Sequence, residues 1–359
     1  MAVSLMEDVI GNTPYGWQKE VIRHMALMPL LNSGVDCAPI LLVRPTGGGK
    51  SSVRDVFSLM GGVVSLTISP LLSLGADQEE KLKAKAKQHL GPVCPIHIDE
   101  FRSVAEQTKT VPKIKGLLKD GDSTVFIFSL PQAIVKNKVW CELIDFLITN
   151  QRLSMVCVDE VHLFAHFGMT FRKEFKDLDK KLFRKLRVGT SRTVTKVPIL
   201  FMTATCTEAI VGRVETMSGL TFDRDNNVFW PPPDEMGHRH VFLDVAYTTQ
   251  PMTNFQNRVG PILERCHVSK FILYTNTRRA IKRETPKLAA WIDKHGYKSD
   301  LLMILGTLQK EQKFFHVRKF CQSNAPNRTI LDTCSEKERP FNPQILTATS
   351  GAANAGIST

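Results

Sequence analysis

The chain has 359 residues, of which 43% are hydrophobic and 23% charged, a composition that argues against a disordered chain and against a bundle of membrane helices. Its length predicts two domains, each with its own core. Forty-seven Lys and Arg against 35 Asp and Glu give a net charge of +12, which favours a polyanionic partner. No apolar run is long enough to cross a bilayer, so we expect a soluble, intracellular protein. The eight cysteines lack a C-x-x-C pair, and we expect neither a disulfide framework nor a zinc site.

Short apolar runs alternate with longer segments of helical character in the first part of the chain. Such alternation predicts an α/β fold in which a parallel sheet is covered by helices on both faces. Ligands of these sheets bind at the carboxyl ends of the strands. The predicted strands are Pro39–Val43, Val63–Ile68, Val125–Phe128, Met155–Val158 and Ile199–Met202.

The alternation breaks at Thr221–His240, where the triple proline Pro231–Pro233 cannot continue a helix or a central strand. We therefore predict a first lobe over residues 1–220, a linker over 221–240 and a second α/β lobe over 241–359. The chain stops soon after the last predicted strand, so we expect the second lobe to be incomplete. Its predicted strands are Lys270–Thr275, Leu301–Leu305 and Ile345–Thr347.

The segment Arg44–Ser51, with the sequence Arg-Pro-Thr-Gly-Gly-Gly-Lys-Ser, joins a predicted strand to a predicted helix. Its three glycines let successive backbone N–H groups surround a phosphate, and the helix adds its N-terminal dipole. Lys50 can reach the terminal phosphates, and the Ser51 hydroxyl can bind Mg²⁺. The usual pattern has Gly where Arg44 stands. The alternative is a flexible glycine turn, which the strand and helix on either side disfavour.

A second polar pair follows the predicted strand Met155–Val158. Asp159 at its end could hold Mg²⁺, and Glu160 could polarise an attacking water. Alone, an Asp-Glu pair after a strand is most often a solvated strand end. Together with the phosphate loop, it indicates a nucleotide hydrolase.

Four motifs in this order resemble the RecQ-like DNA helicases of the second helicase superfamily: the phosphate loop, Ile68–Gln78, Asp159–His162 and Thr203–Thr205. The resemblance implies two RecA-like lobes that bind ATP and Mg²⁺ and move 3′ to 5′ along single-stranded DNA. It implies catalytic roles for Lys50, Asp159, Glu160 and His162, magnesium binding by Ser51 and Asp159, and coupling of hydrolysis to lobe movement by Thr203 and Thr205. The implied ATP-binding residues are Gln18, which would read adenine beside Tyr15 or Trp17, and Thr46, Gly47, Gly48, Gly49, Lys50, Ser51 and Ser52.

The stretch His162–Phe175 resembles the aromatic-rich loop with which this family senses single-stranded DNA. Aromatic faces can stack on unpaired bases, and an arginine can pair with phosphate. A buried phenylalanine stripe is the alternative, because the phenylalanines also fit helical spacing. Phe167 stands where the family usually has Trp. The implied nucleic-acid contacts are Phe167, Phe171, Arg172, Ser69 and Thr275.

The resemblance places the family's arginine finger beyond Thr359. Because such a finger is worth about 10³- to 10⁵-fold in rate, we expect this polypeptide to bind ATP and turn it over slowly. Two other readings stay open: an RNA helicase, which shares the ATPase motifs, and a non-catalytic nucleic-acid-binding remnant. A nuclear location would follow from function in a eukaryote.

Ten Lys and Arg against three Asp and Glu make Phe171–Lys196 strongly basic. Phe175, Leu178, Leu182 and Leu186 form an apolar stripe at helical spacing. The basic side chains expected to point outward are Lys176, Lys180, Lys181, Arg184, Lys185 and Arg187. Such a face is either simply solvated or binds nucleic-acid phosphates, in which case affinity falls steeply with salt.

Overall fold

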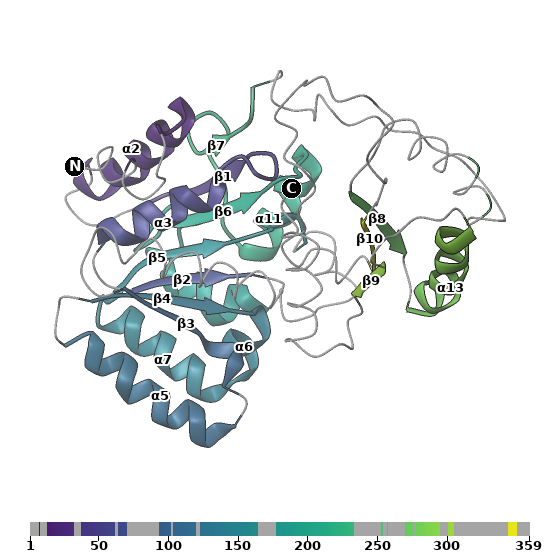
Figure 1. Cartoon of the computed structure of the whole chain (residues 1–359). Coiled ribbons are helices and arrows are strands. Elements are labelled where there is room, and N and C mark those ends of the chain that lie inside the picture. The colour runs from purple at the N-terminus through teal and green to yellow at the C-terminus, as the bar shows by residue number, and fades with distance from the viewer. Residues whose placement is uncertain are drawn as a thin grey trace. The chain divides into compact units, whose positions relative to one another are not determined.

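The computed structural model describes residues 7, 13–31, 37–61, 64–69, 93–101, 103–119, 123–163, 177–232, 253, 257, 270–275, 278–294, 301–304 and 344–349. The chain divides into two compact units, one of residues 1–239 with Ser358 and one of residues 240–357 with Thr359 (Figure 1). Within the described ranges, no helix is both long and apolar enough to cross a bilayer.

The first unit is built on a seven-stranded sheet in the order β3-β4-β2-β5-β6-β1-β7, and every pair of neighbours is parallel. All five predicted strands are present, as β1, β2, β4, β5 and β6. The sequence did not predict β3 or β7. Both lie at the edges of the sheet: β3 contains Pro95, which an edge strand tolerates, and β7 has two residues. The strands are β1 Pro39–Val43, β2 Val64–Ile68, β3 Val93–His97, β4 Thr124–Ser129, β5 Leu153–Val158, β6 Ile199–Thr203 and β7 Val228–Phe229.

Helices cover both faces of this sheet (Figure 1). Side chains of a strand alternate between faces, and β1 shows the result. Ile40 and Leu42 pack with residues of α2 and α3, whereas Leu41 and Val43 belong to the core shared with α5, α6, α7 and α11. The helices are α2 Gly16–Leu31, α3 Lys50–Gly61, α5 Val104–Leu117, α6 Pro131–Lys136, α7 Lys138–Thr149, the π-helical turn η2 Asp179–Phe183, α10 Arg184–Leu186 and α11 Glu208–Ser218, with a 3₁₀ turn η1 at Ile98–Glu100.

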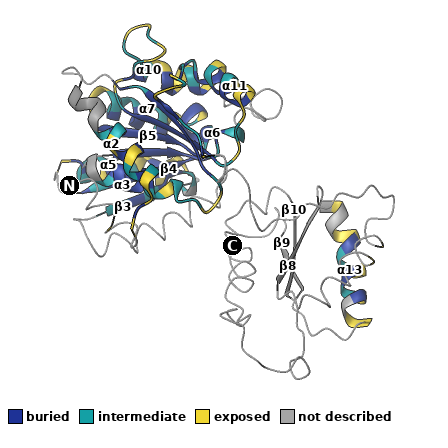
Figure 2. Cartoon of the chain, turned by 90° about the horizontal axis from the view of Figure 1, so that it is seen from above, coloured by how far each residue is buried: buried dark blue, intermediate teal, exposed yellow. Residues whose placement is uncertain are grey.

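Capping residues explain where several helices begin and end. Ser103 and Glu106 form a reciprocal capping box at the start of α5. The Thr207 hydroxyl accepts the Ile210 N–H at the start of α11, and Gly219 ends that helix in the left-handed conformation at φ 64°. Figure 2 shows the buried strands between helices whose outer faces are exposed.

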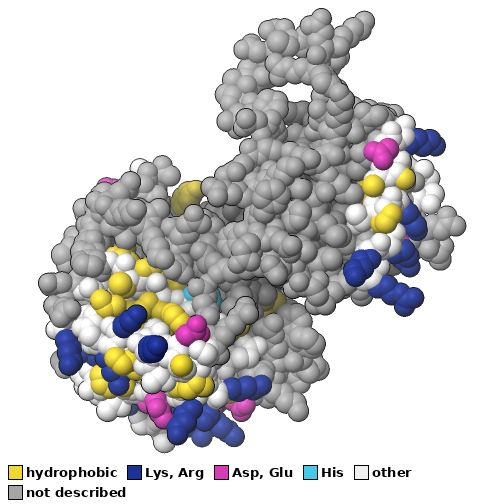
Figure 3. All heavy atoms as spheres, turned by 60° about the horizontal axis from the view of Figure 1, so that its bottom comes forward, with side chains coloured by type: hydrophobic (Ala, Val, Ile, Leu, Met, Phe, Trp, Pro, Cys, Tyr) yellow, Lys and Arg dark blue, Asp and Glu magenta, His cyan; other side chains and the backbone are white. Residues whose placement is uncertain are grey.

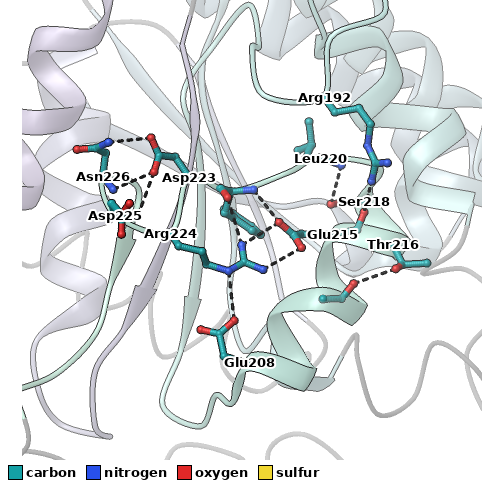
Figure 4. A network of polar contacts seen from close by, with 12 residues as sticks. Arg192, Glu208, Glu215, Thr216, Ser218, Leu220, Asp223, Arg224, Asp225 and Asn226 are labelled. Carbon is teal, nitrogen blue, oxygen red and sulfur yellow. Dashed lines mark hydrogen bonds and ion pairs between the residues drawn. The ribbon is translucent and has the colours of Figure 1, made fainter.

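Residues 221–232, which the sequence assigned to the linker, pack against the first unit. Phe222 is 4% exposed, and β7 pairs with β1. Arg224 donates two hydrogen bonds to Glu215 and one to Glu208, which ties the segment to α11 (Figure 4). The sequence did not predict this packing because β7 has only two residues and lies beside a run of prolines, so it shows no periodic pattern.

The second unit contains a three-stranded parallel sheet in the order β8-β10-β9. Its strands lie where the sequence predicts them, at β8 Lys270–Thr275, β9 Leu301–Ile304 and β10 Gln344–Thr349. Helix α13, Arg278–Lys294, buries Leu288 and Trp291. The predicted α/β class with parallel sheets is therefore confirmed.

Candidate functional site

The phosphate loop connects the end of β1 to the first residue of α3, Lys50. Gly47 at φ 77° and Gly49 at φ 85° adopt a left-handed conformation that residues with a Cβ rarely accept. A Cβ on Gly49 would also lie 2.6 Å from Nε2 of Gln18. The loop closes on itself through a hydrogen bond from the Gly48 N–H to the Pro45 carbonyl at 3.1 Å. The loop is therefore a tight turn at the start of a helix, a place where anions bind in many proteins.

The ammonium group of Lys50 is bound inside this loop. Its Nζ donates to the carbonyl oxygens of Arg44 at 2.9 Å and Pro45 at 3.1 Å. Burial lowers the pKa of Lys50, while the negative charges of Glu160 and Asp159 oppose that lowering. The loop and the end of β5 therefore lie within electrostatic reach of each other.

The two carboxylates are held by the strands on either side of β5. The Asp159 N–H donates to the Ile68 carbonyl at the end of β2, and the Val161 N–H donates to the Met202 carbonyl in β6. Asp159 is 6% exposed, and its Oδ1 accepts the N–H of Glu160 at 2.9 Å. Glu160 adopts a left-handed φ of 50°, which turns the chain immediately after the strand.

One carboxylate oxygen of Glu160 is available as an acceptor. Its Oε2 is buried and accepts no hydrogen bond from the described residues, although Nδ1 of His162 lies 3.3 Å away. A buried carboxylate oxygen without a hydrogen-bond partner is costly to maintain unless a ligand or water uses it. The Oε2 atom of Glu160 can therefore accept a hydrogen bond from a ligand or water.

His162 connects this carboxylate to the end of β6. Its Nδ1 lies 2.9 Å from the Thr203 hydroxyl, which donates to the Thr205 carbonyl at 3.0 Å and accepts the Thr205 N–H at 3.1 Å. Because the single hydroxyl proton goes to Thr205, the network assigns the ring proton of His162 to Nδ1. The predicted coupling residues Thr203 and Thr205 are therefore in one chain of hydrogen bonds with His162, whose ring lies beside the Glu160 carboxylate.

Gln18 lies against the phosphate loop and is 1% exposed. Its Nε2 donates to the Gly49 carbonyl at 3.1 Å, and its Oε1 accepts the Tyr15 N–H at 2.9 Å. Tyr15 and Trp17 stack at 6.4 Å with nearly parallel rings, and Tyr15 is 62% exposed. The predicted adenine-reading glutamine is thus beside the nucleotide loop, with its amide engaged by backbone groups.

The remaining predicted residues are distributed differently. Thr46 and Ser51 are exposed, Ser52 is half-buried, and Ser69 is buried at the end of β2. Thr275 is the last residue of β8, in the second unit. The predicted nucleic-acid contacts Phe167, Phe171 and Arg172 lie outside the described residues, as does most of Ile68–Gln78.

Sequence reasoning missed a buried ion pair on α3, next to the phosphate loop. Arg54 and Asp55 are 1% and 3% exposed, and Nε of Arg54 lies 2.9 Å from Oδ1 of Asp55. Burial opposes the charge on Arg54, but Asp55 and also Asp159 outweigh it and raise the pKa of the guanidinium. The guanidinium also lies 5.4 Å from the ring centroid of Phe128. The sequence signal for this buried pair was its position among the apolar residues Val53, Val56 and Phe57.

The predicted basic face is only partly correct. Leu178, Leu182 and Leu186 are buried, as the apolar stripe requires. The prediction that Arg187 points outward is wrong: its side chain is 12% exposed and donates to the Ser218 carbonyl at 2.8 Å. The reason is that Asp179 pairs with both Arg187 and Arg184, and Asp145 pairs with Lys185.

Exposed cations therefore remain at Lys180, Lys181 and Arg184. On the face seen in Figure 3, Lys and Arg side chains of the described residues lie among acidic and hydrophobic ones. The described residues do not form one continuous basic surface there.

Comparison with known proteins is decisive for the family. The model of the DEAD/DEAH box helicases matches residues 18–211, more than half of the chain. This chain belongs to the DEAD/DEAH box helicase family. The matched range contains Gln18, the phosphate loop, the Asp159–His162 box and Thr203–Thr205.

Curated relatives of this helicase-family chain include RecQ-like DNA helicases, which confirms the resemblance. ATP-dependent DNA helicase Q-like 2 of Arabidopsis thaliana is 28% identical over 208 residues, 56% of this chain and 25% of the relative. ATP-dependent DNA helicase RecQ of a Synechocystis strain is 30% identical over 172 residues, 47% of this chain and 31% of the relative. A putative ATP-dependent RNA helicase of Acanthamoeba polyphaga mimivirus, R290, is 24% identical over 281 residues, 78% of this chain and 44% of the relative. The chain thus spans between a quarter and a half of the length of these relatives.

Solved helicase structures share the fold. Saccharomyces cerevisiae Dbp5 bound to RNA and ADP BeF3 has a TM-score of 0.55 at 12% identity, over 96% of this chain and 73% of that chain. The helicase MrfA bound to DNA has a TM-score of 0.58 at 11% identity, over 96% of this chain and 41% of that chain. At these identities, the likeness establishes the RecA-like α/β fold.

Proposed function

We propose that this chain is the ATP-driven core of a RecQ-like DNA helicase. The observation that carries the proposal is the position of Lys50: it is the first residue of the helix that follows a phosphate loop, and it feels the charges of Asp159 and Glu160. A cation at the loop and two carboxylates across from it are the parts needed to bind a magnesium triphosphate.

The residues present fit a magnesium ion. Ser51 and Asp159 supply the hydroxyl and carboxylate oxygens that Mg²⁺ prefers, and they follow the loop and β5 respectively. When bound, the ion would neutralise charge on the phosphate oxygens. Lys50 would exchange its hydrogen bonds to the Arg44 and Pro45 carbonyls for bonds to phosphate.

Glu160 is the proposed base for the attacking water. Its buried Oε2 accepts no hydrogen bond from the described residues, so it can take a proton. His162 keeps the carboxylate in place through its contacts with Glu160 and Thr203. Because Thr203 also binds Thr205, a change at Glu160 can reach the end of β6, where we propose that hydrolysis is coupled to lobe movement.

The proposed track is single-stranded DNA, with translocation 3′ to 5′ by analogy to RecQ-like helicases. Phe167, Phe171 and Arg172 would stack on bases and pair with phosphates, and Ser69 and Thr275 would contact the backbone. A second candidate is RNA, which the broad match to the mimivirus putative RNA helicase favours.

The experiment is an ATPase assay of the 359-residue chain with single-stranded DNA, with RNA of matching sequence, and with neither. The proposal expects slow hydrolysis that DNA stimulates, and loss of that hydrolysis in Lys50→Ala, with Lys109→Ala, an exposed residue of α5, as the matched control. Greater stimulation by RNA would select the second candidate. Hydrolysis by the wild type no faster than by Lys50→Ala under all three conditions would reject both and support a non-catalytic remnant.

A further inference from the structure

Arg44 stands at the first position of the phosphate loop, where such loops usually have glycine. The residue is 5% exposed, so its side chain is buried. The guanidinium lies 4.7 Å from the ring centroid of Trp17, and its Nη1 donates to the Trp230 carbonyl at 2.8 Å. Arginine suits this place because its planar cation can stack on an aromatic face and donate hydrogen bonds from its edge.

The backbone of Arg44 takes part in the nucleotide site itself. Its carbonyl accepts a hydrogen bond from Nζ of Lys50 at 2.9 Å, and its N–H donates to the Thr203 carbonyl at 3.1 Å. Arg44 thus contacts the proposed phosphate-binding lysine, the strand end that carries Thr203, the segment that carries Gln18, and Trp230. These parts are far apart in the sequence.

Trp230 belongs to the segment by which the chain leaves the first unit, residues 228–232, which we call the exit segment. Its start is fixed by pairing of β7 with β1 and by the Leu41 N–H, which donates to the Asn227 carbonyl. The main part of the first unit runs to Arg239, so the exit segment comes shortly before the boundary between the units in the sequence. The side chain of Arg44 connects the phosphate loop to the exit segment through its hydrogen bond to the Trp230 carbonyl.

We propose that Arg44 is a positioning residue that couples the state of the phosphate loop to the exit segment. This inference rests on the proposed function, because it requires that the loop bind a triphosphate. When phosphate takes the hydrogen bonds of Lys50, the Arg44 carbonyl loses its donor and the loop backbone rearranges. The side chain of Arg44 carries that change to the Trp17 ring and the Trp230 carbonyl.

Hydrogen exchange tests both halves of this inference. Without nucleotide, Arg44→Met should make peptides spanning residues 226–232 exchange about tenfold faster than the wild type, because a hydrogen bond to a charged donor is lost. Exchange in β4, at the other side of the sheet, should not change. Arg213→Met, an exposed arginine of α11, is the matched control and should leave both regions unchanged. Unchanged exchange at 226–232 in Arg44→Met would overturn the proposal.

The second half compares exchange with and without Mg²⁺ and a non-hydrolysable ATP analogue. At analogue concentrations that saturate each protein, exchange at 226–232 should change in the wild type when the analogue binds and should not change in Arg44→Met. An equal change in both proteins, or none in a wild type that binds the analogue, would contradict the coupling. Failure of the wild type to bind the analogue would instead refute the proposed function, while the first comparison would still test the Arg44 contact.

A conservative variant covers the case in which Arg44→Met raises exchange throughout the first unit. Arg44→Lys keeps the charge and the aliphatic stem but loses the planar face and the fork of donors. It should fold, bind the analogue, and show an intermediate loss of coupling at residues 226–232. Full coupling in Arg44→Lys would show that charge alone suffices and would overturn the role assigned to the guanidinium.

Discussion

The phosphate loop and the Asp159–His162 box are the two sides of the proposed nucleotide site, and they differ in how their polar groups are satisfied. In the loop, Lys50 donates to carbonyls of its own turn, and the Gln18 amide is bonded to Gly49 and Tyr15. In the box, Glu160 keeps a buried oxygen that accepts no hydrogen bond from the described residues. Under the proposed function, Lys50 exchanges its hydrogen bonds when nucleotide binds, whereas Glu160 receives a proton on an oxygen that accepts no hydrogen bond from the described residues. Substitutions in the loop should therefore affect binding, and substitutions in the box should affect turnover.

Glu160→Gln should give the largest effect and should separate the two sides cleanly. The amide keeps the size and the position of the carboxylate but cannot accept a proton, so hydrolysis should slow by about 10²- to 10⁴-fold. ATP affinity should stay within threefold of the wild type. Phosphate release and binding of a fluorescent ATP analogue measure the two quantities, with Glu142→Gln on α7 as the control. A variant that lost binding and kept turnover would reverse the assignment of the two sides.

Gly49→Ala should damage the loop and leave the box intact. The left-handed φ of 85° and the close approach of Gln18 predict a loss of about 1–3 kcal/mol in the free energy of unfolding, together with weaker ATP binding. Chemical denaturation followed by circular dichroism measures the loss. Gly212→Ala is the matched control, because this glycine lies inside α11 with nothing near its added Cβ, and alanine there should stabilise the helix by about 0.5–1 kcal/mol. Equal effects of the two substitutions would contradict the strained geometry assigned to the loop.

Thr203→Val should break the connection between the box and the end of β6. Valine keeps the shape but leaves His162 and the Thr205 N–H without their hydroxyl partner, so we expect a rate of ATP hydrolysis about tenfold lower with ATP affinity unchanged. Thr216→Val, in the exposed part of α11, provides the control. If steady-state rates of the two variants agreed, the hydrogen-bond chain would have no role in turnover.

The smallest expected effect is a shift in the pH dependence of ADP affinity, which reports the effect of the Glu160 charge on Lys50. Burial lowers the pKa of Lys50, and the charge of Glu160 opposes that lowering. Removing the charge in Glu160→Gln should lower the pKa of Lys50 further. Because the protonated amine binds phosphate, the loss of ADP affinity on the alkaline side should begin at a lower pH in the variant than in the wild type. Calorimetric titrations without Mg²⁺ measure both profiles, and superimposable profiles would place Glu160 out of reach of Lys50.

Local patterns predicted the parts of the fold and site that are local in origin. Apolar runs revealed β1, β4, β5 and β6 because each is buried on both faces, and β2 was evident although Ser65 and Thr67 interrupt its apolar residues. The glycine loop and the carboxylates after β5 were evident because each follows its strand directly. In contrast, β7 is too short to show a period, and its attachment depends on the partners of Arg224 and Arg44 elsewhere in the chain.

The contacts between residues far apart in the chain could not be predicted from the sequence. Arg44 appeared as a departure from the glycine pattern, but its contact with the Trp230 carbonyl spans 186 positions. Gln18 was identified as a candidate from its neighbours, yet its burial against Gly49 follows from packing of α2 on α3. Helical periodicity predicted that Arg187 points outward, but its ion pair with Asp179 holds the side chain in a largely buried position. Each case depends on a partner that no local period specifies.

The central claim is that Lys50 and Asp159 act on one magnesium-bound triphosphate, and ATP affinity in the presence and absence of Mg²⁺ tests it most directly. The measurement compares the wild type, Lys50→Ala and Asp159→Asn, each with Mg²⁺ and with a chelator. The account predicts that Lys50→Ala weakens ATP binding in both conditions, whereas Asp159→Asn weakens it only when Mg²⁺ is present. An Asp159→Asn protein that gains as much ATP affinity from Mg²⁺ as the wild type would contradict the claim.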